Sequence, residues 1–323
     1  MLLLREPAQL RRSTPVGLPV VAVCISGAGR GAASLRLTAS ALRKHLMEPA
    51  RSSIFTVSVW LEDDAAELTL ERELAGAYPT RSRKDVLRDL PLHLRMTADD
   101  ALAARGLLGR ERIVVNTLRM LHKLRDAEWL RRHAESRLGL PRATLVLRTR
   151  PDLVLTAELK LPGPGPQAAM DLAPDAAVFF PWSCPEQHLV FDQLFALSPE
   201  AASVLLDEAF DSAVSVLAKG QALYPERFLS DHIGASGFAS APFPDPEPCL
   251  AAEACPFALR ALLVSELVPQ AGESAALRSR DPFDTLRAEF PLGGCVYPPR
   301  ATSALRALES VPAPKTSLLS RSV

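Results

Sequence analysis

The chain has 323 residues, of which 48% are hydrophobic and 23% are charged, a balance that excludes an intrinsically disordered protein. Its 37 basic and 37 acidic residues cancel, so the chain as a whole lacks a basic excess and we expect no nucleic-acid partner. No apolar run reaches the roughly 18 residues of a membrane-spanning helix, so we expect no integral membrane segment.

The ends of the chain and its cysteines bear on domain organisation and compartment. We expect a flexible leader at 1–17, one α/β domain over 18–300 and a flexible tail at 301–323. The five cysteines include no C-x-x-C pair, which argues against a zinc site or a disulfide framework. Without a clean secretory signal we expect a cytoplasmic protein, or one of a Golgi-type lumen if an N-terminal anchor is missing.

The first part of the domain predicts a β-α-β unit. Residues 18–25 form a near-continuous, valine-rich apolar run, which is typical of a strand buried on both faces. A glycine-rich turn follows at 26–31, and apolar residues at helical spacing predict a helix over 33–47. The β-branched and aromatic stretch 54–60 predicts a second strand, reached by a right-handed crossover.

The middle of the chain continues this alternation of helices and strands. Residues 63–75 predict a helix, and the polar, arginine-rich stretch 76–110 predicts an irregular excursion over the strand ends. A broad apolar face predicts a long helix over 112–138, which glycine and proline then terminate. The apolar run 143–147 predicts the next buried strand.

The last third predicts further elements of both kinds. Residues 176–180 read as a strand, and 257–265 as a late strand. The segment from 191 leads into a helix over 199–217, with Ser198 as its N-cap, and a short helix follows at 224–235.

This order of elements predicts an α/β fold with a mostly parallel, Rossmann-like sheet and helices on both faces. In such sheets ligands bind in the crevice outside the carboxyl ends of the strands. The loops after the predicted strands are therefore the first places to look for a site.

The turn after the first strand is one candidate. Its glycines, Gly27, Gly29 and Gly31, open a helix, where backbone N–H groups can approach a phosphate, and Arg30 would add a guanidinium that matches phosphate oxygens. The spacing is not the dinucleotide-binding G-x-G-x-x-G, because position 32 is alanine. A tight turn without a ligand is the alternative.

The run Arg148-Thr149-Arg150-Pro151-Asp152, directly after a buried strand, is the sharpest candidate. Charged groups at such a place are costly unless they meet partners. The arginines can hold a diphosphate, and the Asp152 carboxylate can ligate a divalent metal ion. The alternative is a structural Arg–Asp network that fixes the strand end.

Three further residues have weaker claims. Asp192 lies among aromatic residues and could hold a sugar hydroxyl or a metal ion, or it could pair with a helix N-terminus. Glu226 and His232 lie in the short helix at 224–235. His232 is a candidate metal ligand or phosphate contact, although a lone histidine is more often structural.

Several short motifs follow one another along about 18–240. They are the Gly29-Arg30 turn, the helix from Ser34 to Leu46, the strand ending at Trp60, Asn116 at the start of a long helix, the R-x-R-x-D segment from Arg148 to Asp152, the D-Q-x-F segment from Asp192 to Phe195, and Pro225-Glu226. In this order and spacing the chain resembles a glycosyltransferase-like family related to proteins of lipopolysaccharide and capsular polysaccharide synthesis.

The resemblance implies a GT-A-like fold, a nucleotide-sugar donor and a glycan or other hydroxyl acceptor. We expect the donor to be bound by a set of matching residues, with its diphosphate held either through Mn²⁺ or Mg²⁺ at Asp152 or directly by Arg148 and Arg150. The donor-binding set is Gly29, Arg30, Asn116, Arg148, Arg150 and Asp152. Asp152 and His232 are the candidate metal ligands, and Asp192 or Glu226 is the candidate base that takes the acceptor proton.

One departure from the family pattern is visible. The sequence has no D-x-D at this place, because Arg150 stands where the first aspartate is expected. Two other functions therefore stay open: another Rossmann-type enzyme, such as a methyltransferase, that uses the Gly27–Gly31 turn, and a non-catalytic glycosyltransferase-like binding module.

Overall fold

The computed structural model describes residues 18–29, 31–88, 90, 95–155, 158–161, 176–180, 183–184, 189–190, 194–242 and 257–258. In this part of the chain a seven-stranded sheet has the order β10-β6-β9-β4-β1-β2-β3. Its strands, in chain order, are β1 (Val20–Gly27), β2 (Ile54–Leu61), β3 (Thr80–Ser82), β4 (Leu145–Thr149), β6 (Ala176–Phe180), β9 (Leu194–Leu197) and β10 (Ala239–Pro242).

The sheet is mostly parallel. The strands β4, β1, β2 and β3 run the same way, and β10 is parallel to β6. Only β9 is antiparallel to its neighbours β4 and β6, so it is the one reversed strand among the seven. Two short antiparallel pairs lie outside this sheet: β5 (Val154–Leu155) with β11 (Phe257–Ala258), and β7 (Ser183–Cys184) with β8 (Leu189–Val190).

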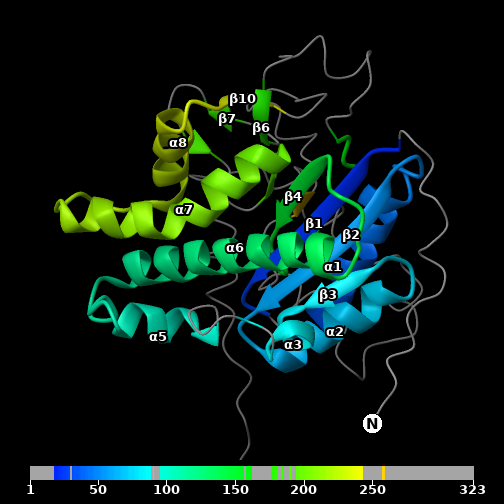
Figure 1. The fold of residues 1–323 in the computed structure, drawn as a ribbon, viewed down its shortest axis with the longest axis horizontal. Helices are drawn as coiled ribbons and strands as arrows, with labels where there is room; N and C mark the ends of the chain where they lie inside the picture. Colours follow the sequence, from blue (N-terminus) through cyan, green and yellow to red (C-terminus); the bar gives the residue numbers. More distant parts are fainter. Residues whose placement is uncertain are drawn as a thin grey trace, which may run out of the picture.

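Helices cover both faces of the sheet (Figure 1). The helical segments are α1 (Ala32–Leu42) with its π-helical continuation η1 (Arg43–Met47), α2 (Asp64–Ala75), α3 (Arg83–Val86), α5 (Ala98–Ala103), α6 (Arg112–Arg137), α7 (Pro199–Ala218) and α8 (Pro225–Ala235). In Figure 1, α6 and α7 lie side by side across one face, with α5 beside α6, while α1 and α2 lie behind the sheet.

The pleat of β1 divides its side chains between two cores. Val21, Val23 and Ile25 belong to the core that α1 and α2 cover, whereas Ala22 and Cys24 belong to the core under α6 and α7. Because successive side chains of a strand point to opposite faces, a strand buried on both sides reads as a continuous apolar run. That is why the sequence shows no alternation here.

Most predicted elements are confirmed, including the strands at 18–25, 54–60 and 176–180 and the helices at 33–47, 63–75, 112–138, 199–217 and 224–235, each shifted by at most two residues at an end. Ser198 is the N-cap of α7, since its hydroxyl accepts a hydrogen bond of 3.1 Å from the Ala201 N–H. The α/β fold with a mostly parallel sheet is confirmed as well.

Three predictions were wrong in part. The stretch 76–110 is not wholly irregular, because its described residues include the edge strand β3 and the short helices α3 and α5. Residues 194–197 form the strand β9 rather than a lead into the helix. The strand predicted at 143–147 lies at Leu145–Thr149, so Arg148 is inside the sheet and not after it.

Some predictions concern residues outside those that the structure describes. The leader at 1–17 and the tail at 301–323 are among them, as is most of the late strand at 257–265, of which 257–258 form β11. The right-handed crossover between β1 and β2 stays a prediction. None of the described helices is long and apolar enough to cross a membrane.

Candidate functional site

The strand order reverses at β1, because β2 lies on one side of it and β4 on the other. In open α/β sheets such a switch point places a crevice at the carboxyl ends of the strands. We call the loops that follow β1, β2 and β4 the carboxyl edge. The glycine turn and the Arg150-Pro151-Asp152 loop both lie there.

Pro151 joins the two loops of the switch point. A Cβ atom on Gly27 would lie 2.8 Å from Pro151 Cδ, so only glycine lets the loop after β4 approach the end of β1 this closely. From α1, the Thr38 hydroxyl donates a hydrogen bond of 2.9 Å to the Pro151 carbonyl oxygen. These two contacts hold the backbone between Arg150 and Asp152 in place.

Gly29 also serves packing. A Cβ atom there would lie 2.6 Å from the Cβ of Ala66 in α2, so the absence of a side chain lets the turn pack against that helix. Gly31 differs, because it caps α1 with a φ of 97° and a Cβ atom there would meet open space. Arg30 lies outside the described residues. For Gly27 and Gly29, tight packing accounts for the glycine without a ligand.

Arg150 and Asp152 form a two-pronged ion pair. Arg150 Nε donates to Asp152 Oδ1 and Arg150 Nη2 donates to Asp152 Oδ2, each at 2.7 Å. The Asp152 side chain is 5% exposed, whereas that of Arg150 is 25% exposed. A guanidinium that matches a carboxylate in this way also matches two phosphate oxygens. The structure thus brings these two predicted site residues together.

Arg148 occupies a different environment from the one predicted. It lies within β4, is 1% exposed, and its guanidinium carbon is 5.6 Å from the centre of the Phe195 ring. Arg148 and Phe195 are register partners in the β4–β9 pair, so they lie on the same face of the sheet. The side chain is part of the core under α6 and α7, which removes it from the exposed strand end.

The structure adds Lys123, which sequence reasoning missed. Lys123 extends from α6 to form an ion pair with Glu62, the residue that follows β2. Burial lowers the pKa of Lys123, and the positive charge of Arg150 adds a smaller effect in the same direction. Together they lower this pKa to about 8. A lysine between Leu121 and Leu124 on a mostly buried helix was the available signal.

Glu67 is a second buried charge that the sequence analysis did not single out. Its two oxygens accept hydrogen bonds from the backbone N–H of Leu61 at 2.8 Å and of Lys84 at 3.3 Å. Burial raises the pKa of Glu67 to about 7, although these bonds and the charge of Arg83 oppose the shift. Glu67 therefore ties α2 to the end of β2 and to the start of α3.

Asn116 and His232 make their described contacts elsewhere. Asn116 is exposed on α6 and accepts a hydrogen bond of 3.3 Å from Arg119, which also pairs with Asp99 of α5. His232 of α8 stacks on Phe228, and its Nε2 lies 3.3 Å from the Leu205 carbonyl oxygen of α7. Burial lowers the pKa of His232, as expected for a packed, structural histidine.

The two predicted metal ligands do not form part of a recognisable metal centre. Across the residues that can be described, no three or more His, Cys, Asp or Glu side chains gather as a metal-binding group. Asp152 is paired with Arg150, and the contacts of His232 lie between α7 and α8. Of the predicted catalytic residues, Asp192 lies outside the described residues, and Glu226 is in α8 without a described side chain.

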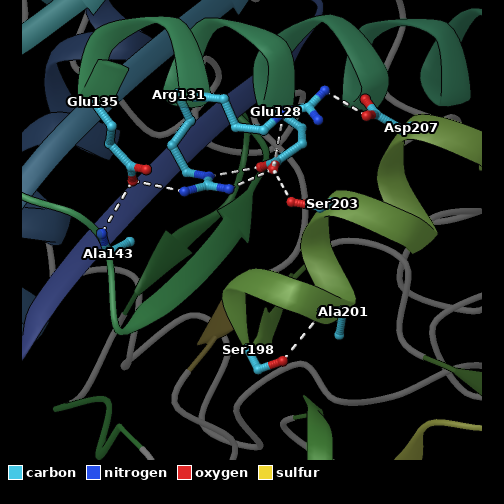
Figure 2. A network of polar contacts seen from close by, with 9 residues as sticks. Glu128, Arg131, Glu135, Ala143, Ser198, Ala201, Ser203 and Asp207 are labelled. Atoms are coloured by element: carbon cyan, nitrogen blue, oxygen red, sulfur yellow. Dashed lines mark hydrogen bonds and ion pairs between the residues drawn. The ribbon is translucent and has the colours of Figure 1, made fainter.

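A separate polar network lies between α6 and α7 (Figure 2). Arg131 donates to Glu128 at 2.7 Å and to Glu135 at 2.6 Å, and Glu135 accepts a hydrogen bond of 3.1 Å from the Ala143 N–H. Ser203 and an Arg132–Asp207 pair connect it to α7. Most of its polar groups pair within the network, which indicates a structural role in positioning α6.

Comparison with known proteins does not assign the chain to a family. No protein-family model matches the chain, and no curated protein matches it.

Proposed function

We propose that the chain is a glycosyltransferase that binds a nucleotide-sugar at the carboxyl edge and transfers the sugar to a hydroxyl group of a glycan or similar acceptor. One observation carries this proposal. The Arg150–Asp152 pair stands at the switch point between β1 and β4, with Pro151 locked between Gly27 and Thr38. Together with the motif order from Gly29 to Glu226, this arrangement favours a donor with a diphosphate group.

The chemistry of sugar transfer fits cations at this edge. The departing nucleoside diphosphate gains negative charge, and fixed positive groups stabilise that charge in the transition state. Arg150 and Lys123 both carry positive charge here, each close to the ends of the parallel strands. The single reversed strand β9 in an otherwise parallel sheet is compatible with the GT-A-like fold that the resemblance implies.

The described residues do not fit a divalent metal ion at this edge. Both oxygens of Asp152 accept hydrogen bonds from Arg150, and a cation would have to displace that guanidinium. We therefore derive no step through Mn²⁺ or Mg²⁺, and the proposed charge stabilisation uses Arg150 and Lys123. Asp192 and Glu226 remain the proposed bases for the acceptor hydroxyl.

Calorimetric titration with a panel of nucleotide-sugars, with and without manganese, tests the proposal. We expect at least one of them to bind, and Arg150→Met to weaken that binding by about tenfold or more, because a charge-assisted pair of hydrogen bonds to phosphate is lost. The exposed Arg137→Met at the end of α6 is the matched control and should bind like wild type.

Failure of every nucleotide-sugar to bind would overturn the proposal. Binding without sugar transfer to any glycan acceptor would instead support a non-catalytic binding module. The methyltransferase alternative makes the opposite prediction for the glycine turn: a bulky residue at Gly29 would abolish cofactor binding while Asp152→Ala would leave it intact.

A further inference from the structure

Four polar residues lie at the carboxyl edge, where α6 packs against β1 and β2: Ser26, Glu62, Arg150 and Lys123. Ser26 lies in β1 two positions after Cys24, whereas Glu62 and Arg150 are in the loops that directly follow β2 and β4. Because side chains two apart on a strand share a face, Ser26 lies on the same side of the sheet as Cys24, and Arg150 is close enough to Lys123 for its charge to act on that amine. Lys123 approaches them from α6 through its ion pair with Glu62.

Ser26 supplies an observation independent of the charges. It is 1% exposed, and among the described residues its hydroxyl has no hydrogen-bond partner. Ser26 pairs in register with Trp60 of β2, while its neighbour Ile25 pairs with Thr149 of β4, so the hydroxyl lies at the level where Arg150 follows. A buried hydroxyl without a protein partner is available to hydrogen-bond an atom of a bound ligand, because such groups are rarely left unsatisfied.

Within the described part of the chain, the two cations of this cluster pair with carboxylates that differ in burial. Arg150 is held by Asp152, which is 5% exposed, whereas Lys123 is held by Glu62, which is 47% exposed. An exposed side chain on a loop can move away at little cost, and a buried one that makes two hydrogen bonds cannot. Glu62 is therefore the carboxylate that an incoming anion would replace.

We propose that Lys123, Arg150 and Ser26 form a binding subsite for the diphosphate of the donor, and that Glu62 holds the place of that anion on Lys123 until the donor binds. The identity of the ligand rests on the proposed function, whereas the anion subsite follows from the four side chains themselves. In this arrangement two protein cations neutralise the diphosphate directly.

The electrostatics of Lys123 agree with this role. Its neighbours include the Glu62 carboxylate and the Arg150 guanidinium, whose charge helps to lower the pKa of Lys123. Two positive charges that face one another in a buried place repel, and an anion between them removes the repulsion. Pyrophosphate binding should therefore raise the pKa of Lys123 and favour its protonated form.

Titration of the full chain with pyrophosphate in the presence of a chelator tests the subsite. At pH 7 we expect Lys123→Met to weaken pyrophosphate binding about tenfold or more, since it removes a charge-assisted contact. Glu62→Gln should tighten binding severalfold, because it removes the competing carboxylate. Lys219→Met, at an exposed position after α7, changes the net charge equally and should leave binding as in wild type.

If Lys123→Met fails to fold, Glu62→Gln still tests the proposal, because Glu62 is exposed and its substitution should not disturb the fold. Unchanged or weaker pyrophosphate binding by Glu62→Gln would overturn the proposal. Lys123-dependent pyrophosphate binding without binding of any nucleotide-sugar would leave the subsite standing and overturn the proposed function. If a nucleotide-sugar binds and Lys123→Met does not change its affinity, the proposed function would stand and the subsite would be overturned.

Discussion

At the scale of single residues, the carboxyl edge holds ionisable groups whose burial changes their protonation. Glu67 is fully buried and Lys123 nearly so, and the pKa of each moves toward neutrality, to about 7 and about 8 respectively. Desolvation disfavours the charged form in both cases, which raises the pKa of an acid and lowers that of an amine. The stability and the binding behaviour of this edge should therefore depend on pH near neutrality.

Glu67 gives the first stability prediction. Its pKa in the folded protein, about 7, lies above the ordinary value of 4.5, so its stabilising contribution is present in full below about pH 4.5 and is lost as the pH rises through 7. A shift of this size corresponds to about 3 kcal/mol in the free energy of unfolding. We expect Glu67→Gln, which mimics the protonated acid, to match wild type at pH 5 and to be the more stable protein at pH 8.

Urea unfolding of both proteins at several pH values measures this difference. Glu200→Gln, at an exposed position in the first turn of α7, is the matched control and should show no comparable gain between pH 5 and pH 8. A difference between Glu67→Gln and wild type that stays constant with pH would show that Glu67 does not titrate in this window.

At the scale of elements, long periodic segments could be predicted and short ones could not. The helix predicted at 112–138 has 26 residues in the structure, and its apolar face is unambiguous. The strand β9 has only the four residues of Leu194–Leu197, and a short apolar run does not distinguish a strand from a helix. The three-residue strand β3 contains Arg81 and forms because β2 offers an edge to pair with.

The candidate site was predictable only in part, for a related reason. Arg150 and Asp152 are two positions apart in the sequence and follow a visible strand, so their pairing could be anticipated. Arg148 lies inside β4, where its guanidinium packs against Phe195 of β9. This strand neighbours β4 in the sheet but is distant from it in the sequence. Lys123 reaches the edge from a helix, and neither its partner Glu62 nor its approach to Arg150 leaves a local pattern in the sequence.

The buried charges of α6 carry the element-scale prediction. Arg131 is 4% exposed and pairs with Glu128 and Glu135 on its own helix, with Glu128 itself fully buried. Burial would lower the pKa of Arg131, but the hydrogen bond and charge of Glu128 raise it above its usual value. Arg131→Met should therefore cost about 3–5 kcal/mol, because it leaves a buried carboxylate without its cation.

Urea unfolding at pH 7 measures this cost. Arg131→Met combined with Glu128→Met should recover much of the stability, since it removes both buried charges together. Arg137→Met, at the exposed last residue of α6, should change the free energy of unfolding by less than about 0.5 kcal/mol. A loss below about 1 kcal/mol for the single Arg131 variant would mean that the network does not hold α6 in place.

At the scale of the whole molecule, the site lies above the most enclosed part of the sheet. The strand β1 pairs with β2 from Val20 to Gly27 and with β4 from Val21 to Ile25, and helices cover both of its faces. Because β1 is held on both sides, the loops that follow β1 and β4 have fixed positions. The proposed diphosphate subsite would be pre-organised by these loops, which would lower the cost of binding.

This arrangement predicts an uneven pattern of amide hydrogen exchange. Local opening requires fewer broken contacts at the two ends of the strand order, so amides of β3 and β10 should exchange faster than those of Val21–Ile25 in β1. Saturating pyrophosphate should slow exchange in the loops after β1, β2 and β4, and leave β3 and β10 unchanged. Exchange measured by mass spectrometry, with Lys123→Met as the control that removes the ligand effect, reports both differences. Equal protection of β1 and β3 would contradict the view that the site rests on the most stable part of the molecule.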